Sequence, residues 1–119
     1  MLIEAIRYAH FDMAKYLVDQ GPEFINFKNI RYRTALYFAC AYAGEDEETT
    51  DAYVDIALWM VSKGADYNIK TKDEITPLEW AKKWDQKKKT VGFKDALIAA
   101  ADGVTPTPLA IGAKRVYWG

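Results

Sequence analysis

GADYNIKTKDEITPLEWAKKW, residues 64–84, decides how the rest of the chain is interpreted. A Gly-Ala-Asp turn leads through polar residues to Thr76, Pro77 and Leu78, where a helical pattern begins. Proline is well tolerated at the first position of a helix, and the threonine before it can cap the free amides. Gly64 can end the preceding helix because glycine accepts the left-handed conformation at a helix C-terminus. The stretch therefore predicts a helix ending at Gly64, a turn, and a new helix after Thr76.

The same features recur along the chain at related intervals. Three Leu-x-x-Ala pairs are spaced 34 and 42 residues apart, and two glycines that end helical patterns are spaced 43 apart. The pairs are Leu2/Ala5, Leu36/Ala39 and Leu78/Ala81, and the glycines are Gly21 and Gly64. Every interval becomes 33 when two insertions are subtracted. One is a single residue in GPEFIN (21–26), and the other is nine residues around GEDEETTDA (44–52). The chain therefore contains an internal repeat.

This repeat resembles that of ankyrin-repeat proteins, whose unit of about 33 residues is a β-turn followed by two helices with a Thr-Pro-Leu-His signature. Residues 64–76 match the family's spacing without a gap, and AHFDMAKYLVDQG (9–21) is similar to its Gly-His-Leu-Glu-Ile-Val run. Some signature positions depart from the family: Glu79 and Tyr37 replace histidine, Ala35 replaces proline, and Glu74 and Tyr32 replace the usual turn glycine.

The resemblance implies an all-α fold, a solenoid of helix-turn-helix units joined by short β-hairpin turns. We expect an ankyrin-repeat domain over residues 1–101, with repeat boundaries near 1–26, 27–69 and 70–101, stacked in a right-handed manner. Residues 102–119 are then a C-terminal tail or degenerate cap. A helix is expected near 91–101, with Val91, Leu97 and Ile98 facing inward.

The core of such a stack can be predicted from the apolar pattern. Ala39 and Ala81 are small, as is required where stacked helices approach closely. Because one repeat cannot bury its apolar face alone, neighbouring repeats must stack. The residues that we expect on the buried face of the second helices are Phe11, Ala14, Tyr16, Leu17 and Val18 in the first repeat, and Val54, Ile56, Leu58, Trp59, Met60 and Val61 in the second.

Composition limits the classes of function. The 119 residues fit one domain, and the net charge of −1 argues against a general polyanion binder. The single cysteine, Cys40, excludes a disulfide scaffold within the chain and favours a reducing compartment. Neither a membrane-spanning apolar run nor a secretory signal pattern is found. We expect a cytoplasmic protein that does not contact membrane.

Catalytic and metal-binding chemistry finds no support in the residues. His10 and Cys40 would have to form any Cys-His pair, but Cys40 follows Ala39 on the buried side of its helix and His10 occupies a turn position. The acidic segment 44–52 lacks the alternating carboxylates and central glycine of a calcium loop, so we interpret it as a solvated loop. The sequence therefore predicts no enzyme, no cofactor and no metal site.

Ankyrin-like domains bind partners through their hairpin tips and the concave face of their first helices. The resemblance carries these positions onto eight residues, which are Arg7, Tyr8, Arg31, Arg33, Tyr42, Lys72, Lys83 and Trp84. Arginine, tyrosine and tryptophan are enriched at binding hot spots. We expect a protein-interaction module for an acidic or tyrosine-rich partner, acting as a small inhibitor, adaptor or immunity-type protein. Two alternatives stay open: the cations only keep the hairpins soluble, or the same basic groove binds nucleic acid, which the acidic segment would oppose.

Three further expectations follow from the predicted stack. The side chain of Trp84 should point away from the stack. Deletion of 44–52, taken to lie between helices, should leave the fold intact. Since residue 2 already lies in a predicted helix, no polar repeat shields that end, and exposed repeat ends associate. We therefore expect either self-association or coverage of one end by residues 102–119.

Overall fold

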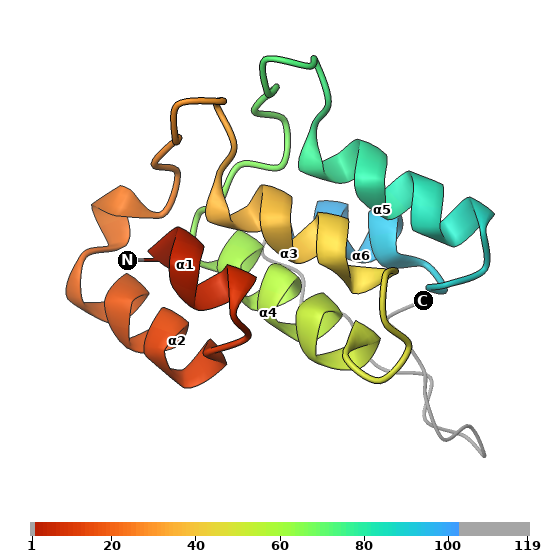
Figure 1. The fold of residues 1–119 in the computed structure, drawn as a ribbon, viewed down its shortest axis with the longest axis horizontal. Helices are drawn as coiled ribbons and strands as arrows, with labels where there is room; N and C mark the ends of the chain where they lie inside the picture. The colour runs from red at the N-terminus through yellow and green to blue at the C-terminus, as the bar shows by residue number, and fades with distance from the viewer. Residues whose placement is uncertain (1, 103–119) are drawn as a thin grey trace.

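The computed structural model describes residues 2–102, and within them all regular structure is helical (Figure 1). The elements are α1 (Leu2–Arg7), α2 (Phe11–Gln20), the 3-10 helix η1 (Pro22–Phe24), α3 (Ala35–Ala43), α4 (Thr50–Ser62), α5 (Pro77–Gln86) and α6 (Phe93–Ala101). The predicted all-α class is therefore confirmed. The predicted tail or cap lies, except for its first residue, outside the described residues.

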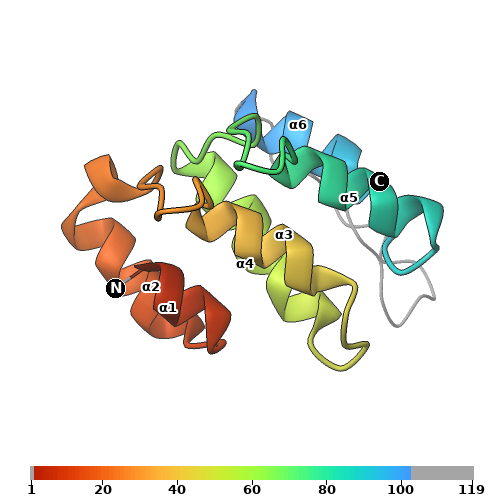
Figure 2. The same cartoon turned by 45° about the horizontal axis from the view of Figure 1, so that its top comes forward.

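The helices form two layers. In the first layer α3 packs between α1 and α5 (Figure 2). Each of the remaining α-helices packs against one member of this layer, α2 on α1, α4 on α3 and α6 on α5, and α4 also packs on α6. One side of the first layer is thereby left free of other helices, and it carries the candidate site described below.

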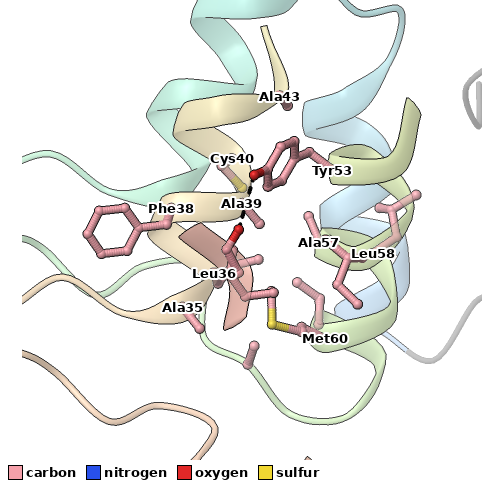
Figure 3. Close-up of a cluster of buried hydrophobic side chains, with 14 of the residues drawn as sticks. Ala35, Leu36, Phe38, Ala39, Cys40, Ala43, Tyr53, Ala57, Leu58 and Met60 are labelled. Atoms are coloured by element: carbon pink, nitrogen blue, oxygen red, sulfur yellow. Dashed lines mark hydrogen bonds between the residues drawn. The ribbon is translucent and has the colours of Figure 1, made fainter. Parts of the chain in front are cut away.

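The core lies between the two layers. Leu36 and Ala39 of α3 meet Ala57 and Met60 of α4 in its centre (Figure 3), and none of the four is measurably exposed. Ala81 is also fully buried, as the need for close helix approach predicts. Among the eleven positions predicted on the buried face of the first two repeats' second helices, one is wrong: Tyr16 of α2 is exposed. The reason is that α2 packs against α1 and η1, so its other side faces solvent.

Threonine caps start two first-layer helices. The Thr76 hydroxyl accepts a hydrogen bond from the Glu79 amide at 3.2 Å, and the Glu79 carboxylate accepts one from the Thr76 amide at 2.7 Å. This reciprocal arrangement is a capping box, and Pro77 occupies the first helical position. Thr34 caps α3 through the Tyr37 amide at 3.2 Å. The predicted cap at Thr76 is confirmed.

The two glycines that follow second helices behave differently. Gly64 has φ of +108°, which agrees with the predicted positive-φ end of α4. Gly21 has φ of −146°, so it follows α2 without the left-handed conformation that the same helix-ending role would predict for it. The physical reason is Pro22, which starts η1 at once, and the Phe24 amide donates to the Gly21 carbonyl at 3.0 Å.

Two turns at one edge of the first layer have matching hydrogen bonds, and we call them the tip turns, residues 29–33 and 71–75. In the first, the Asn29 amide donates to Arg33 O at 3.0 Å and its Oδ1 accepts from the Arg31 and Arg33 amides. In the second, Thr71 makes the equivalent bonds with Asp73 and Ile75. The Lys72 amide donates to Arg31 O at 3.0 Å and thus joins the two turns.

A second bridge joins the segments below the tip turns. The side-chain amide of Asn26 donates to Gly64 O at 3.1 Å, and its oxygen accepts from the Asp66 amide at 2.7 Å. Asn26 therefore pairs the carbonyl of Gly64, two residues after the end of α4, and orients the turn that follows.

The acidic insertion is partly helical. Thr50, Asp51 and Ala52 form the first turn of α4, and Thr50 is buried with its hydroxyl donating to Asp46 O at 3.0 Å. The prediction that the whole segment lies between helices is therefore wrong, because its last three residues extend α4. The exposed part, Glu45–Glu48, agrees with a solvated loop.

The final helix begins two residues later than the sequence predicts. Gly92 has φ of +68° and provides no side chain, so Asp85 of α5 caps α6 instead. Its carboxylate accepts from the Thr90 hydroxyl at 2.6 Å and from the amides of Phe93 and Lys94, both at 3.0 Å. Val91 lies before this start and is exposed, so its predicted inward position is wrong.

Candidate protein-interaction surface

Aromatic side chains from four helices form a row in which each ring contacts the next. We call it the aromatic row, and its members are Phe11 of α2, Tyr53 of α4, Tyr42, Phe38 and Tyr37 of α3, and Trp80 and Trp84 of α5. Successive ring centroids lie between 5.1 and 6.3 Å apart, which is within the roughly 4.5–7 Å range of favourable aromatic pairs. The row crosses the molecule from α2 to α5.

Cationic side chains lie over several of these rings. The distances from cation to ring centroid are 5.3 Å for Arg7 over Phe38, 5.3 Å for Arg33 over Tyr37, 4.8 Å for Lys83 over Trp80 and 6.0 Å for Lys87 over Trp84. Each such pair contributes about 0.5–1 kcal/mol where it is exposed. The aromatic row is thus fringed by positive charge contributed by α1, by the first tip turn and by the end of α5.

Trp84 does not occupy the position that the sequence predicts. Its side chain is only 8% exposed, and its indole N–H donates to Cys40 O at 2.8 Å. Its ring stacks on Trp80 with centroids 5.4 Å apart. Trp84 therefore belongs to the joint between α3 and α5. Trp80, which the sequence did not single out, is the more exposed of the pair.

At the α1 end of the site, Arg7 and Tyr8 are both exposed and the Arg7 guanidinium lies 6.0 Å from the Tyr8 ring. A side-chain hydrogen bond with Tyr42 raises the pKa of Arg7 above its ordinary value, so the guanidinium stays charged. Tyr42 itself is half-buried. Three of the predicted site residues are therefore brought together here, around the end of α1 and α3.

The tip turns hold Arg31, Arg33 and Lys72. The Arg33 guanidinium lies 3.5 Å from the Asp73 carboxylate, an ion pair across the two turns. Tyr32, exposed between them, has Lys28 Nζ at 4.7 Å and Lys72 Nζ at 5.3 Å from its ring centroid. Lys28 and Lys72 therefore hold positive charge around the exposed ring of Tyr32, while Asp73 pairs with Arg33. Tyr32 is a residue that sequence reasoning missed as a contact.

The acidic loop follows the C-terminal end of α3, opposite the first tip turn. A shallow depression of about 260 Å³ is lined by Tyr42, Glu45, Asp46, Thr49 and Tyr53. Burial, with smaller contributions from Tyr42 and Glu45, raises the pKa of Tyr53, whose hydroxyl donates to Ile6 O at 3.1 Å. The acidic loop and the first tip turn, which carries Arg31 and Arg33, thus have opposite charge at the two ends of α3.

Cys40 and His10, the two residues weighed for a Cys-His pair, lie in different surroundings in the described part of the chain. Within residues 2–102 no three potential metal ligands gather in one place. Cys40 is fully buried, as predicted for a small core residue, and burial raises the pKa of its thiol. His10 precedes α2, and its side chain makes no capping hydrogen bond. Over the same residues, no helix combines the length and apolarity needed to span a bilayer.

Comparison with known protein families finds no match to this chain, and neither does comparison with curated proteins.

Five members of the aromatic row were not predicted as site residues, namely Phe11, Tyr37, Phe38, Tyr53 and Trp80. Tyr37, Phe38 and Tyr53 are buried, whereas Phe11 and Trp80 are partly exposed. Helical spacing gives a partial signal, since Phe38 and Tyr42 lie four residues apart, as do Trp80 and Trp84, and such pairs share a helix face. Spacing alone does not show which member of each pair is covered by the neighbouring helix.

Proposed function

We propose that the chain is an ankyrin-type protein-interaction module that binds a partner protein through the first-layer face of α1, α3 and α5. The observation that carries the proposal is the aromatic row with its fringe of cations. Aromatic and arginine side chains dominate binding hot spots because they bury much area and also form polar contacts.

The ankyrin-type arrangement is supported by the agreement between repeat spacing and local geometry. Asn29 and Thr71 lie 42 residues apart, the same interval as Leu36 and Leu78, and each organises a tip turn with the same set of hydrogen bonds. Tyr32 and Glu74, at the positions of the usual turn glycine, both have positive φ, 60° and 62°.

The chemistry of the face favours a partner segment with carboxylates beside apolar or aromatic groups. Half-exposed rings such as Trp80 and Tyr42 supply apolar area. Arg7 and Lys83 hold positive charge over neighbouring rings, and arginine pairs bidentately with carboxylate. Such an acidic or tyrosine-rich partner is consistent with a role as an inhibitor, adaptor or immunity-type protein. Trp84 contributes by supporting the face from below.

Affinity purification from the source cells, followed by titration of the captured partner, tests the proposal. Lys83→Glu changes a cation over Trp80 and Trp84, whereas Lys82→Glu makes the same change on the adjacent exposed residue, which lies over no ring within residues 2–102. We expect Lys83→Glu and Arg7→Glu to weaken binding about tenfold or more, and Lys82→Glu to leave it within about twofold. Equal effects of Lys82→Glu and Lys83→Glu would contradict the assignment.

Binding to a polyanion would point instead to the nucleic-acid alternative. In that case affinity falls steeply with salt and each lost lysine weakens binding uniformly, Lys82 included. A single protein partner with the selective pattern above excludes this alternative.

A further inference from the structure

Exposed large apolar side chains are concentrated at one end of the molecule. Eight such residues occur among residues 2–102, each at least 48% exposed, and seven of them lie between positions 8 and 32: Tyr8, Met13, Tyr16, Phe24, Phe27, Ile30 and Tyr32. The eighth is Val91, at the opposite end of the stack. This distribution is unlike the scattered exposure of single apolar residues that is normal for a surface.

Four of these residues share the outer end formed by α2, η1 and the residue segment that follows. We call Met13, Tyr16, Phe24 and Phe27 the N-terminal apolar patch; they are between 52% and 62% exposed. The elements carrying them lie at the end of the layers away from α5 and α6 (Figure 2). Whereas α4 packs closely against both α3 and α6, α2 packs closely against α1 and η1 and meets α4 at the Phe11–Tyr53 ring pair. The patch thus lies where a stacked neighbour would bury it.

The two ends of the stack carry opposite charge. Residues 11–24 hold Asp12, Asp19 and Glu23 against Lys15, an excess of two negative charges. Residues 77–101 hold six lysines against three carboxylates, an excess of three positive charges. Lys87, Lys88 and Lys89 directly precede the exposed Val91. An apolar side chain among lysines at one end therefore complements an apolar patch among carboxylates at the other.

We propose that a second copy of the chain docks the lysine-rich loop 87–91 of its C-terminal end on the N-terminal apolar patch. The contact is head to tail, so each bound copy still offers a free patch at one end and a free loop at the other. Heterologous contacts of this kind extend into longer assemblies unless the rotation closes a ring. The docking surfaces share Lys87 with the cation fringe of the partner-binding face, but the proposal does not depend on that face binding a partner.

Sedimentation velocity of the full chain over a range of concentrations tests this contact. We expect assemblies that grow with concentration and weaken with salt, because exposed charges are screened. Lys88→Glu with Lys89→Glu should weaken the association at least tenfold, and Asp19→Lys with Glu23→Lys should do the same. The combination of all four changes should restore association by exchanging the signs. A wild-type chain that stays monomeric at low salt up to about 1 mM, or association that none of these variants alters, would overturn the proposal.

Thiol labelling of the full-length Tyr16→Cys variant shows what covers the patch. Since Cys40 is fully buried, the new thiol is the reactive one. We expect fast labelling in dilute solution and at least tenfold slower labelling at concentrations where the chain associates. Protection that does not change with concentration would mean that the chain covers its own patch, and unprotected labelling at every concentration would mean that nothing does. Either result would overturn the proposal.

Discussion

Trp84 joins α3 and α5 through both edges of its indole ring. Its N–H satisfies the Cys40 carbonyl, one of the last four of α3, which have no partner within the helix. The ring also occupies the space beside Gly44, where a Cβ would overlap it. Sequence spacing placed Trp84 correctly on the helix that lines the site but not on the correct side, because the side that α3 covers depends on how α3 and α5 cross.

Substitution of Trp84 should therefore reduce stability. We expect Trp84→Phe to lower the free energy of unfolding by about 1–2 kcal/mol, since it leaves a buried acceptor unpaired. Trp84→Ala should cost about 3–5 kcal/mol through the cavity it leaves. Trp80→Phe is the control and should cost less than Trp84→Phe, because the Trp80 N–H has no hydrogen-bond partner among the described residues. Urea unfolding measures all three, and a stable Trp84→Ala would contradict the assigned role.

Glu74 has φ of +62° in the second tip turn, a conformation that strains residues with a Cβ. We expect Glu74→Gly to raise the free energy of unfolding by about 0.5–1 kcal/mol, since glycine adopts positive φ without this cost. Lys70→Gly is a matched control outside the positive-φ positions and should be neutral or destabilising. Thermal unfolding of both variants decides the matter: equal destabilisation by the two would show that no strain is relieved.

Because of Cys40, the free energy of unfolding should fall at alkaline pH. Its thiol has an ordinary pKa of 9.0 when unfolded, and burial raises the pKa in the folded chain. Above about pH 9 the unfolded chain loses this proton while the folded chain keeps it, so rising pH favours unfolding. Relative to Cys40→Ala, the wild type should lose stability between pH 9 and 10.5. Urea titrations of both proteins at pH 7 to 10.5 measure the difference in their free energies of unfolding. A difference that stays constant with pH would contradict the assigned effect of the Cys40 thiol.

At the scale of elements, helix starts were the most predictable features. Thr76 and Pro77 carry their own capping chemistry, and the structure places α5 accordingly. The starts of α4 and α6 were not predictable in the same way. The extra turn at Thr50 depends on a hydroxyl bond to Asp46 O, and the start of α6 depends on Asp85 from another helix. Capping by a residue of another helix, as at α6, leaves no local pattern in the sequence, and the local bond from Thr50 to Asp46 O follows no common capping signature.

Deletions within the acidic insertion should separate its loop from its helical part. Removing 45–48 takes out exposed residues together with the Asp46 carbonyl that accepts from the Thr50 hydroxyl. It should lower the free energy of unfolding by about 1–2 kcal/mol, mainly through this lost hydrogen bond, because loop closure depends weakly on length. Removing 44–52 also takes out Gly44 beside Trp84 and the buried Thr50, and should cost at least about 2 kcal/mol more. Urea unfolding of the two deletions compares them; equal stability would show that the first turn of α4 contributes nothing.

At the scale of the whole molecule, repeat spacing predicted that residues far apart in the chain would gather on one side. Arg7, Arg33 and Lys83, from three predicted repeats, do all lie over rings of the aromatic row. The sequence did not show that the rings form one continuous row. That continuity depends on Tyr37 and Trp80 meeting across α3 and α5, with centroids 6.3 Å apart, which is a property of helix packing.

Site-specific photo-crosslinking tests whether the face of α1, α3 and α5 binds a partner protein. A photoreactive residue is placed in separate full-length chains at Arg7 and Lys83 on the proposed face, and at Lys82 and Lys63 as exposed controls. The chains are then irradiated in the source cells. We expect both face positions to give a cross-linked product with the same partner protein, and the two controls to give none. Cross-links to that partner from Lys82 and Lys63, with none from Arg7 and Lys83, would contradict the assignment of the binding face.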